Sequence, residues 1–451
     1  MTMHGDKGDT VTPGQRPVDC DVVVIGGGPA GSTAAALLAE RGHKVTLLEK
    51  SRHPRFHIGE SLLPANLPLF RRMGLEDEIR AIGMKKPGAE FVSPWHETSQ
   101  GFQFSDAWAK SMPYAYQVRR SEFDEVLIRN AAKKGAAVME GCRVRDVEFD
   151  AEGAMVRAKH EDGRTESLRA RFVVDASGRD TFLANRFKAK QRNRKHNSAA
   201  IYGHFSGAQR QAGEAEGNIT IFWFDHGWFW FIPLMNGVTS IGATVWPYYM
   251  KTRGKRPPRE FLFDTIALCP QLQMRLTNAT LVSPVEATGN YSYVCDRTHG
   301  PGYLLLGDAY AFIDPVFSSG VLLAMNSAFA GTDVVDTILR RPAEGPAALA
   351  RFDRLMKHGP REFSWFIYRI TTPTMRNLFM GPSNRWRMKE ALLSLLAGDI
   401  FGQTPIWGGI RRFKAVYYVA AALTLKQSLL AWRRRNRNIR PVDEPAMPET
   451  T

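Results

Sequence analysis

The sequence has 451 residues, enough for two or three packed modules with a substantial core. Its 44% hydrophobic and 23% charged residues are typical of a globular protein and exclude an intrinsically disordered chain. The formal net charge is +15, and much of the excess lies in residues 411–440, which hold nine Lys or Arg and no acidic residue. An acidic partner is therefore expected at the C-terminal segment.

The first 19 residues contain no apolar run, so we predict a disordered lead, no secretory signal and a cytoplasmic protein. The four cysteines stand far apart, with no CxxC pair and no cluster of histidines. This spacing excludes a disulfide framework, predicts no metal site and favours buried, reduced thiols.

A βαβ unit opens the globular part of the chain. Residues 21–25 form a short apolar run typical of a buried parallel strand. Residues 32–41 are rich in Ala and Leu and predict a helix that ends at Gly42, and residues 45–48 predict a second strand.

Later segments return to the same domain. Strands are predicted at 172–175 and 303–306, each followed by a glycine turn, and a helix is predicted from about 321 to 340. The stretches near 90–115 and 195–300 alternate aromatic, β-branched and polar residues in short runs, as the strands of an antiparallel sheet do.

The segment from Gly26 to Gly31 satisfies the G-x-G-x-x-G pattern between the first predicted strand and the first predicted helix. Gly26 permits the tight turn, Gly28 lets the backbone approach a pyrophosphate, and Gly31, which follows Ala30, allows close packing of helix on strand. Glu49 ends the second strand, where its carboxylate accepts hydrogen bonds from ribose hydroxyls. These features together predict a dinucleotide site.

Two further elements favour FAD over NAD as the dinucleotide. Arg120 lies in a V-x-R-x-x-F-D element that ends at Asp124, and Asp308 follows a glycine at the end of a later strand. With the βαβ unit, they resemble the para-hydroxybenzoate hydroxylase-like FAD fold over most of residues 20–340. The resemblance implies an α/β architecture in which a discontinuous Rossmann-type FAD-binding domain carries an inserted antiparallel β-sheet substrate domain. Residues 341–451 predict a helical C-terminal region with a basic tail.

Three motifs narrow the chemistry. His57–Pro64 resembles the G-E-S-x-L-P strap that flavin-dependent halogenases share with related reductases, Trp228–Pro233 fits the W-x-W-x-I-P signature of the halogenases, and Asp314–Gly320 resembles the flavin-ring loop of those that act on phenols, pyrroles or carrier-bound substrates. The family resemblance implies FAD contacts at Gly59, Glu60, Ser61, Pro315, Gly320 and Val321.

The same resemblance implies a wall between flavin and substrate, formed by Trp228, Trp230, Pro233 and Phe317. Because the indoles keep the substrate away from the flavin, halide is oxidised to hypohalous acid instead. In halogenases, a lysine just before a glycine turn then directs the halogen. Lys86 precedes such a turn and is the expected catalytic residue, with its neighbour Lys85 as the weaker candidate.

Tryptophan halogenases carry a Glu in the Asp-Pro loop where this chain has Phe317, which favours a phenol or pyrrole type of substrate over tryptophan. The backbone N–H groups of Ser319 and Gly320 are the expected halide site. The chain lacks a second Rossmann fingerprint, so we expect FADH2 from a separate flavin reductase, together with dioxygen and chloride or bromide. A geranylgeranyl-reductase-like flavoprotein, an aromatic-ring flavin monooxygenase and a catalytically silent FAD protein remain as alternatives.

The basic C-terminal segment leaves three interpretations open. Residues 413–432 are apolar and favour a helix, but lysines interrupt them, leaving 415–425 as a stretch too short to span a bilayer. Its aromatic residues and following arginines suit a helix at the inner face of a membrane, and the charge also suits an acidic acyl-carrier protein that brings a bound substrate. The third interpretation is a packed helix with a solvated tail. No nucleic-acid partner is expected, because no recognised module accompanies the charge.

Overall fold

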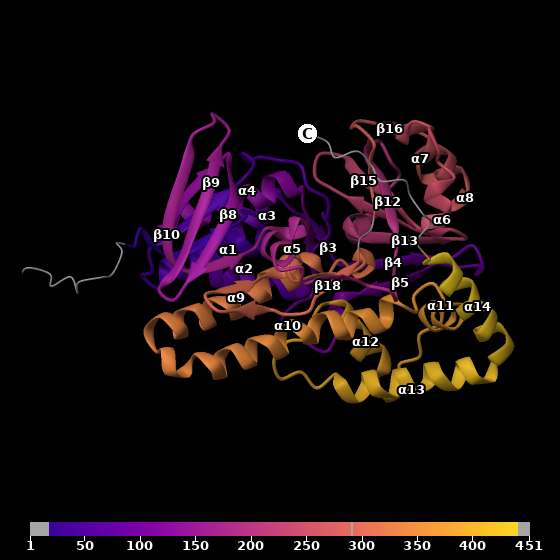
Figure 1. Ribbon diagram of the computed structural model, residues 1–451. Coiled ribbons are helices and arrows are strands. Elements are labelled where there is room, and N and C mark those ends of the chain that lie inside the picture. The colour runs from indigo at the N-terminus through magenta and orange to yellow at the C-terminus, as the bar shows by residue number, and fades with distance from the viewer. Residues whose placement is uncertain (1–17, 290–291, 441–451) are drawn as a thin grey trace, which may run out of the picture.

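The computed structural model describes residues 18–289 and 292–440, in which two large sheets stand side by side above a layer of long helices (Figure 1). Except for Val18 and Asp19, the lead expected over residues 1–19 lies outside the described residues, as does the end of the basic tail from residue 441. All four cysteines are buried and free, which confirms the prediction of reduced thiols.

The first sheet has eight strands, and its parallel centre is the order β20-β10-β1-β2-β7. These strands are Tyr303–Leu305, Thr165–Asp175, Cys20–Ile25, Val45–Glu49 and Ala137–Glu140. β8 (Cys142–Asp150), β9 (Gly153–His160) and β19 (His299–Gly300) add antiparallel strands at its margins. The expected parallel βαβ unit and the two later strands are confirmed.

Helices cover this sheet and supply its core. α1 (Pro29–Glu40) packs against α4 (Arg120–Lys133) and α9 (Gly320–Arg340). α1 begins three residues before the prediction because Pro29 is well suited to the first helical position, where a missing N–H costs nothing. Among the described residues, α9 is the one helix long and apolar enough to cross a membrane, but it is mostly buried between α1 and α10 (Gly345–Ile367).

The second sheet also has eight strands, in the order β16-β12-β15-β14-β13-β4-β5, with β17 beside β12. The strands are β4 (Gly88–Val92), β5 (Gln100–Gln103), β12 (Ala199–Ser206), β13 (Ile219–Phe224), β14 (Gly227–Pro233), β15 (Val238–Val245), β16 (Thr280–Leu281) and β17 (Glu286–Thr288). Most pairs are antiparallel as expected, but β4 joins β13 in parallel, a pairing of two strands that are distant in the chain.

Strand β14 separates two cores by its alternation. Trp228 and Trp230 face a core shared with the C-terminal helices, whereas Phe229 and Phe231 face a core covered by helices from residues 258–275. Both faces of β14 are buried, so its sequence is continuously apolar. Because successive side chains of a strand point to opposite faces, their alternation decides which ring lies on which side.

The expectation of strands throughout residues 195–300 was incomplete. The structure has three helices there: α6 (Pro247–Lys251), α7 (Pro258–Ala267) and α8 (Pro270–Arg275). Each helix carries a proline in its first turn, which is a helix-start pattern that the alternation of side chains does not reveal.

The C-terminal region is helical, as predicted. α10, α11 (Pro373–Met380) and α12 (Met388–Leu396) lead to two further helices, α13 (Trp407–Leu423) and α14 (Leu425–Asn438). The single helix expected over 413–432 was wrong: the chain bends at Thr424, whose non-helical φ of −110° and ψ of 39° separate α13 from α14. After the bend, α14 packs against α11 and α13 and runs beside the turn between β13 and β14 (Figure 1).

Candidate active site

An elongated cavity of about 400 Å³ lies between the first sheet, the start of α9 and the edge of the second sheet. Its walls contain most of the residues expected to hold FAD: Gly26, Gly28, Ala30, Glu49, Gly59, Ser61, Arg120, Asp308, Pro315, Gly320 and Val321. They come from six separate stretches of the chain, and the parallel strands bring them to one edge of the sheet.

At its first and last glycines, the turn at the head of this cavity has no room for a side chain. A Cβ at Gly31 would lie 1.8 Å from the carbonyl oxygen of Gly26, so only glycine lets α1 pack this closely on β1. The Glu49 carboxylate accepts a hydrogen bond from the backbone N–H of Gly27 at 2.6 Å and from that of Ser51 at 2.9 Å. The acid expected to contact ribose is therefore held at the mouth of the turn.

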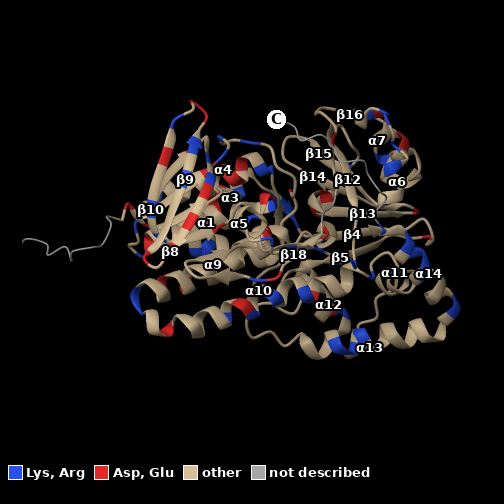
Figure 2. Cartoon of the chain, viewed as in Figure 1, with Lys and Arg blue, Asp and Glu red and all other residues tan. Residues whose placement is uncertain are grey.

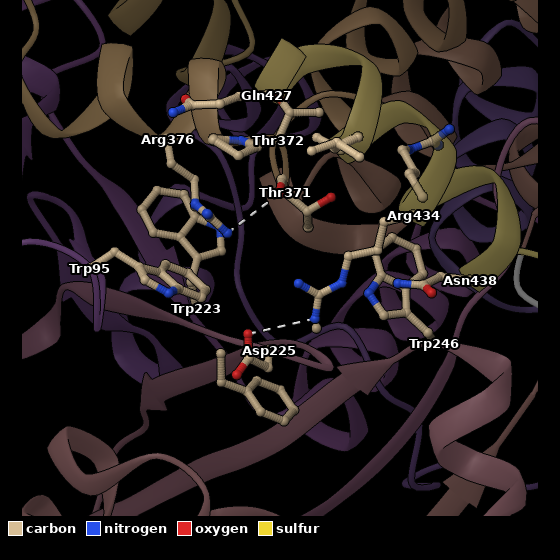
Figure 3. A pocket seen from close by; sticks show the side chains of 16 residues that line it. Trp95, Trp223, Asp225, Trp246, Thr371, Thr372, Arg376, Gln427, Arg434 and Asn438 are labelled. Atoms are coloured by element: carbon tan, nitrogen blue, oxygen red, sulfur yellow. Dashed lines mark hydrogen bonds and ion pairs between the residues drawn. The ribbon is translucent and has the colours of Figure 1, made fainter. Parts of the chain in front are cut away.

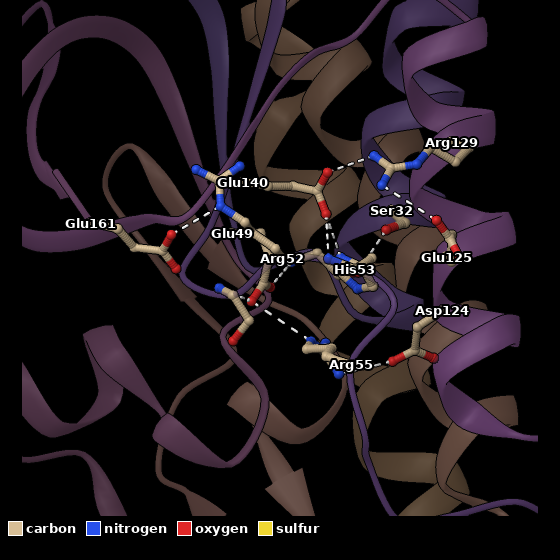
Figure 4. Close-up of polar contacts among 12 residues, drawn as sticks. Ser32, Glu49, Arg52, His53, Arg55, Asp124, Glu125, Arg129, Glu140 and Glu161 are labelled. Atoms are coloured by element: carbon tan, nitrogen blue, oxygen red, sulfur yellow. Dashed lines mark hydrogen bonds and ion pairs between the residues drawn. The ribbon is translucent and has the colours of Figure 1, made fainter.

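Charged residues that the sequence analysis missed surround this turn (Figure 4). The Arg55 guanidinium lies 3.8 Å from Glu49 and donates a hydrogen bond at 3.2 Å to Asp124, a buried carboxylate that also binds Arg120. Arg179, after β10, lines the same cavity. Arg179 beside Gly178 and Arg55 before the G-E-S strap could have been predicted as part of this site, because a pyrophosphate requires nearby cations or N–H groups.

Burial changes the acid-base behaviour of two groups that line the cavity. Burial, and then the nearby Arg120 charge, lower the pKa of His57 to about 4, so its imidazole is neutral at pH 7. Burial raises the pKa of Asp308 to about 6, against the opposing influence of Arg120 and Arg179. Asp308 is the residue expected to bind the ribityl chain.

Lys86 is buried, with only 1% of its surface exposed, at the end of β3 (Met84–Lys86). Its ammonium donates hydrogen bonds of 2.9 Å to Ser61 Oγ and to the carbonyl oxygen of Leu62, and lies 5.3 Å from the ring centre of Phe104. Burial lowers its pKa to about 7. Lys85, the weaker candidate, is exposed over Tyr114.

The two expected indoles lie next to each other in the wall of the second sheet. Trp230 lines the FAD cavity, and its ring centre is 6.0 Å from that of Trp228. Trp230 Nε1 donates to Ser240 Oγ at 3.2 Å, and its ring occupies the space over Gly242, where a Cβ would lie 2.3 Å from it. Because Gly242 in β15 has no side chain, the indole of Trp230 can occupy this space.

The loop before α9 is held by a buried carboxylate. Asp314 accepts hydrogen bonds from Ser198 Oγ at 3.0 Å and from the backbone N–H of Val316 at 3.1 Å, and it lies 2.9 Å from His196 Nε2. Ser318 then adopts a left-handed φ of 57°, a strained conformation typical of functional loops. The hydroxyl of Ser319 is buried without a hydrogen-bond partner.

The remaining predicted residues support the walls. Phe317 is buried against Phe366 and Phe379, and Pro233 ends β14 opposite Thr239. The carboxylate of Glu60 lies 2.9 Å from His204 Nε2 on β12. The structure thus places the predicted residues around one region, and the role of each remains a prediction.

A family model for the FAD binding domain matches residues 19–340. The flavin-dependent halogenase armH3 of Armillaria mellea is 34% identical over 352 residues, covering 72% of this chain and 69% of that protein. The 1H-pyrrole-2-carbonyl-[peptidyl-carrier protein] chlorinase of Pseudomonas fluorescens is 30% identical over 407 residues, covering 85% of this chain and 90% of that protein. The chain belongs to the flavin-dependent halogenases.

Other relatives agree with this assignment. The tryptophan 2-halogenase of Chondromyces crocatus is 35% identical over 346 residues; the match covers 75% of this chain but only 65% of that protein. The structure of the myxobacterial chondrochloren halogenase CndH aligns with a TM-score of 0.76 at 33% identity, covering 90% of this chain and 97% of that one. The expected Rossmann-type FAD fold with a helical C-terminal region is confirmed, and the chain is an FAD-binding enzyme.

Replacing Gly28 with Ala tests the dinucleotide site without disturbing the fold. Its added Cβ would have no neighbour closer than 3.8 Å, so we expect an unchanged melting temperature. The methyl group would stand where the backbone approaches the pyrophosphate, and FAD affinity should fall at least tenfold, measured by flavin fluorescence. The matched control is Gly101→Ala, where an added Cβ meets nothing within 4 Å. Equal FAD affinity in both variants would contradict the site.

Proposed function

We propose that this member of the flavin-dependent halogenases installs chlorine or bromine on an electron-rich aromatic ring of the phenol or pyrrole type. A separate flavin reductase supplies its FADH2. The observation that carries the proposal is the buried amine of Lys86, which has no carboxylate partner among the described residues. It donates a hydrogen bond to Ser61, and Ser61 lines the FAD cavity. When bound, FADH2 supplies the electrons with which dioxygen is activated to oxidise halide.

The residues present fit FAD. Backbone at Gly26 and Gly28 leaves space for the pyrophosphate at the start of α1, and Arg55 adds a cation there. Glu49 would accept hydrogen bonds from the ribose hydroxyls. Asp308 lines the cavity, has a raised pKa and would bind hydroxyls of the ribityl chain.

Halide would bind at the start of α9. The N-terminus of this 21-residue helix carries partial positive charge from its free backbone N–H groups, which favours an anion beside Ser319 and Gly320. The buried Ser319 hydroxyl has no hydrogen-bond partner, and a halide ion is an acceptor that would satisfy it.

Lys86 would carry the halogen to the substrate. An ammonium has no lone pair, so only the neutral amine can take an electrophile, and a pKa of about 7 makes about half the amines neutral at pH 7. The Nζ atom takes the halogen from hypohalous acid with release of water. The ring carbon then takes the halogen from Nζ, and the ring proton returns to the nitrogen.

The aromatic wall would keep the organic substrate from the flavin. Trp230 stands in the cavity wall with Trp228 beside it. Phe317 belongs to the loop from Asp314 to Gly320, here called the halide loop, and packs against Phe379. Phe317 in place of a carboxylate favours a ring activated by its own oxygen or nitrogen. The preference against tryptophan stays a prediction, because one relative is named a tryptophan 2-halogenase. The carrier-bound pyrrole in the name of another relative supports a carrier-bound substrate as one form.

Lys86→Met is the decisive variant. With reduced FAD, bromide or chloride and a simple phenol, the native enzyme should give products with halogen isotope patterns in mass spectrometry. The variant should give less than about 1% of that product while reduced FAD is still oxidised. Because the change removes a buried amine that is costly to ionise, the free energy of unfolding at pH 7 should not fall by more than about 1 kcal/mol.

Lys85→Met is the matched control, since Lys85 is exposed and adjacent, and it should retain full activity. Undiminished halogenation by the Lys86 variant would disprove the relay. A product heavier by one oxygen would instead favour a monooxygenase, and hydrogen added to a polyene would favour a reductase.

The pH dependence of stability gives a second test of Lys86. Burial lowers its pKa from 10.5 to about 7, so between these values the unfolded chain holds one proton more than the folded chain. Stability therefore rises with pH in this window, by at most about 1.4 kcal/mol per pH unit. The difference in unfolding free energy between native enzyme and Lys86→Met should show this slope from pH 7.5 to 9.5. Halogenation should also increase through pH 7. If the unfolding free energies of the native enzyme and Lys86→Met change with pH in parallel, the pKa of Lys86 is not lowered by folding.

We also propose that the enzyme is cytoplasmic and binds the inner face of the membrane peripherally through α13 and α14. Figure 2 shows Lys and Arg gathered on these helices. Large apolar side chains are exposed beside them, with Leu423 at 83%: Tyr418, Val419, Leu423, Leu425, Leu429, Leu430 and Trp432. An apolar face with basic neighbours favours an interface rich in anionic lipid.

Flotation with vesicles containing phosphatidylglycerol tests this location. The native protein should float with them at low salt, and the double variant Leu423→Glu, Trp432→Glu should lose most of that binding because both side chains enter the lipid. Met274→Glu, which changes a 64% exposed side chain on α8, is the control and should bind normally. Binding that is absent, or equal in all three proteins, would exclude the membrane proposal.

A further inference from the structure

A second cavity, of about 350 Å³, lies beneath α14 (Figure 3). The turn between β13 and β14 forms one side, the segment from Thr371 to Arg376 forms another, and α14 from Gln427 to Asn438 closes it. None of its lining residues has a role in the reaction described above.

The walls of this cavity carry more positive than negative charge. Among the described residues that line it, Arg376, Arg434 and Arg435 are cationic and Asp225 is the one carboxylate. Asp225 lies 3.7 Å from Arg434, on the outer side where both are more than half exposed. The two more deeply placed guanidiniums, those of Arg376 and Arg435, form no ion pair with Asp225 or with any other carboxylate of the described residues.

Both of these arginines have an unused donor. The Nε atoms of Arg376 and Arg435 are buried and have no hydrogen-bond partner. Arg376 is stacked 3.6 Å from the ring centre of Trp95, and Arg435 uses one Nη to donate to the carbonyl oxygen of Lys195 at 2.6 Å. Burial lowers the pKa of each to about 10, the sign of a cation removed from water without compensation.

An oxyanion in the cavity would balance the charge of these two guanidiniums. Guanidinium donates from a planar fork that fits phosphate oxygens, and one phosphate accepts from two arginines at once. Three indoles, Trp95, Trp223 and Trp246, also line the cavity beside the arginines (Figure 3). The ligand should therefore combine a phosphate with an extended organic part.

The cavity also leads toward the halide loop. Gly227, Trp246 and Thr371 line both this cavity and a much smaller one. The other walls of the smaller one include Trp228 and Asp314, that is, the indole wall and the residue that caps the loop. An organic arm that starts at the arginines thus points toward the reaction site.

We propose that the cavity beneath α14 binds the phosphate ester of an extended arm that carries the aromatic substrate toward the halide loop. The inference rests on the proposed halogenation and adds to its aromatic substrates molecules that carry a phosphate ester remote from the ring. The prosthetic arm of a carrier protein is one chemical example.

Binding of 4′-phosphopantetheine tests the site without turnover. Three tryptophans line the cavity, so intrinsic fluorescence reports occupancy, with calorimetry as a second measurement. We expect 4′-phosphopantetheine to bind at least tenfold more tightly than either pantetheine or inorganic phosphate. Arg376→Gln should weaken its binding at least tenfold, and Arg376→Lys, which keeps the charge and loses the fork, should weaken it less.

Arg143→Gln, at an exposed position on β8, is the control and should bind like the native protein. If Arg376→Gln does not fold, Arg376→Lys alone decides: native affinity in it overturns the proposal. If pantetheine binds as tightly as 4′-phosphopantetheine, the cavity does not recognise the phosphate. If inorganic phosphate binds as tightly, the cavity does not recognise the organic arm. Failure of halogenation with intact phosphopantetheine binding would refute the proposed function alone, whereas halogenation of a free phenol without this binding would refute the present inference alone.

Discussion

The burial of an unpaired amine at Lys86 is the constraint on which the site depends. A cation without a carboxylate partner is costly in a protein interior, and here Ser61 and Leu62 offer only neutral oxygens. Burial therefore favours the neutral amine and lowers the pKa of Lys86 to about 7. Such a residue weakens the folded state, which is the relation between stability and activity expected at a catalytic position. Because Ser61 belongs to both the lysine's surroundings and the FAD cavity, the amine is fixed beside the cofactor site.

The aromatic wall depends on strand register. Side chains alternate along β14, so Trp228 and Trp230 face the shared core while Phe229 and Phe231 face the other side. A slip of one residue would replace both indoles with phenyl rings. Gly242 on β15 and the hydrogen bond to Ser240 determine the position of Trp230 from the neighbouring strand. The spacing of the motif is thus a consequence of sheet geometry.

The FAD site was predictable because its residues follow local rules. The glycine turn, Glu49 at a strand end and Asp308 after a later strand each have a pattern that the chain displays within a few residues. Arg55 and Arg179 were missed, since their place beside the turn results from loops whose path no periodicity encodes. The break at Thr424 and the parallel pairing of β4 with β13 depend on tertiary packing, which propensity does not determine. The same holds for the cavity beneath α14, whose walls come from five separate segments.

The loop at Asp314 connects the two cavities physically. On one side, Pro315 lines the FAD cavity, and on the other the Asp314 carboxylate faces the small cavity beside His196 and Ser198. The same carboxylate holds the backbone of the turn that precedes Ser319, the expected halide residue. Packed interiors change by discrete rearrangement rather than by gradual deformation. A group that enters the small cavity therefore contacts the anchor of the halide loop directly. In the proposed function, substrate arrival and halide placement would thus share one buried carboxylate, and the two would lie on opposite faces of this turn.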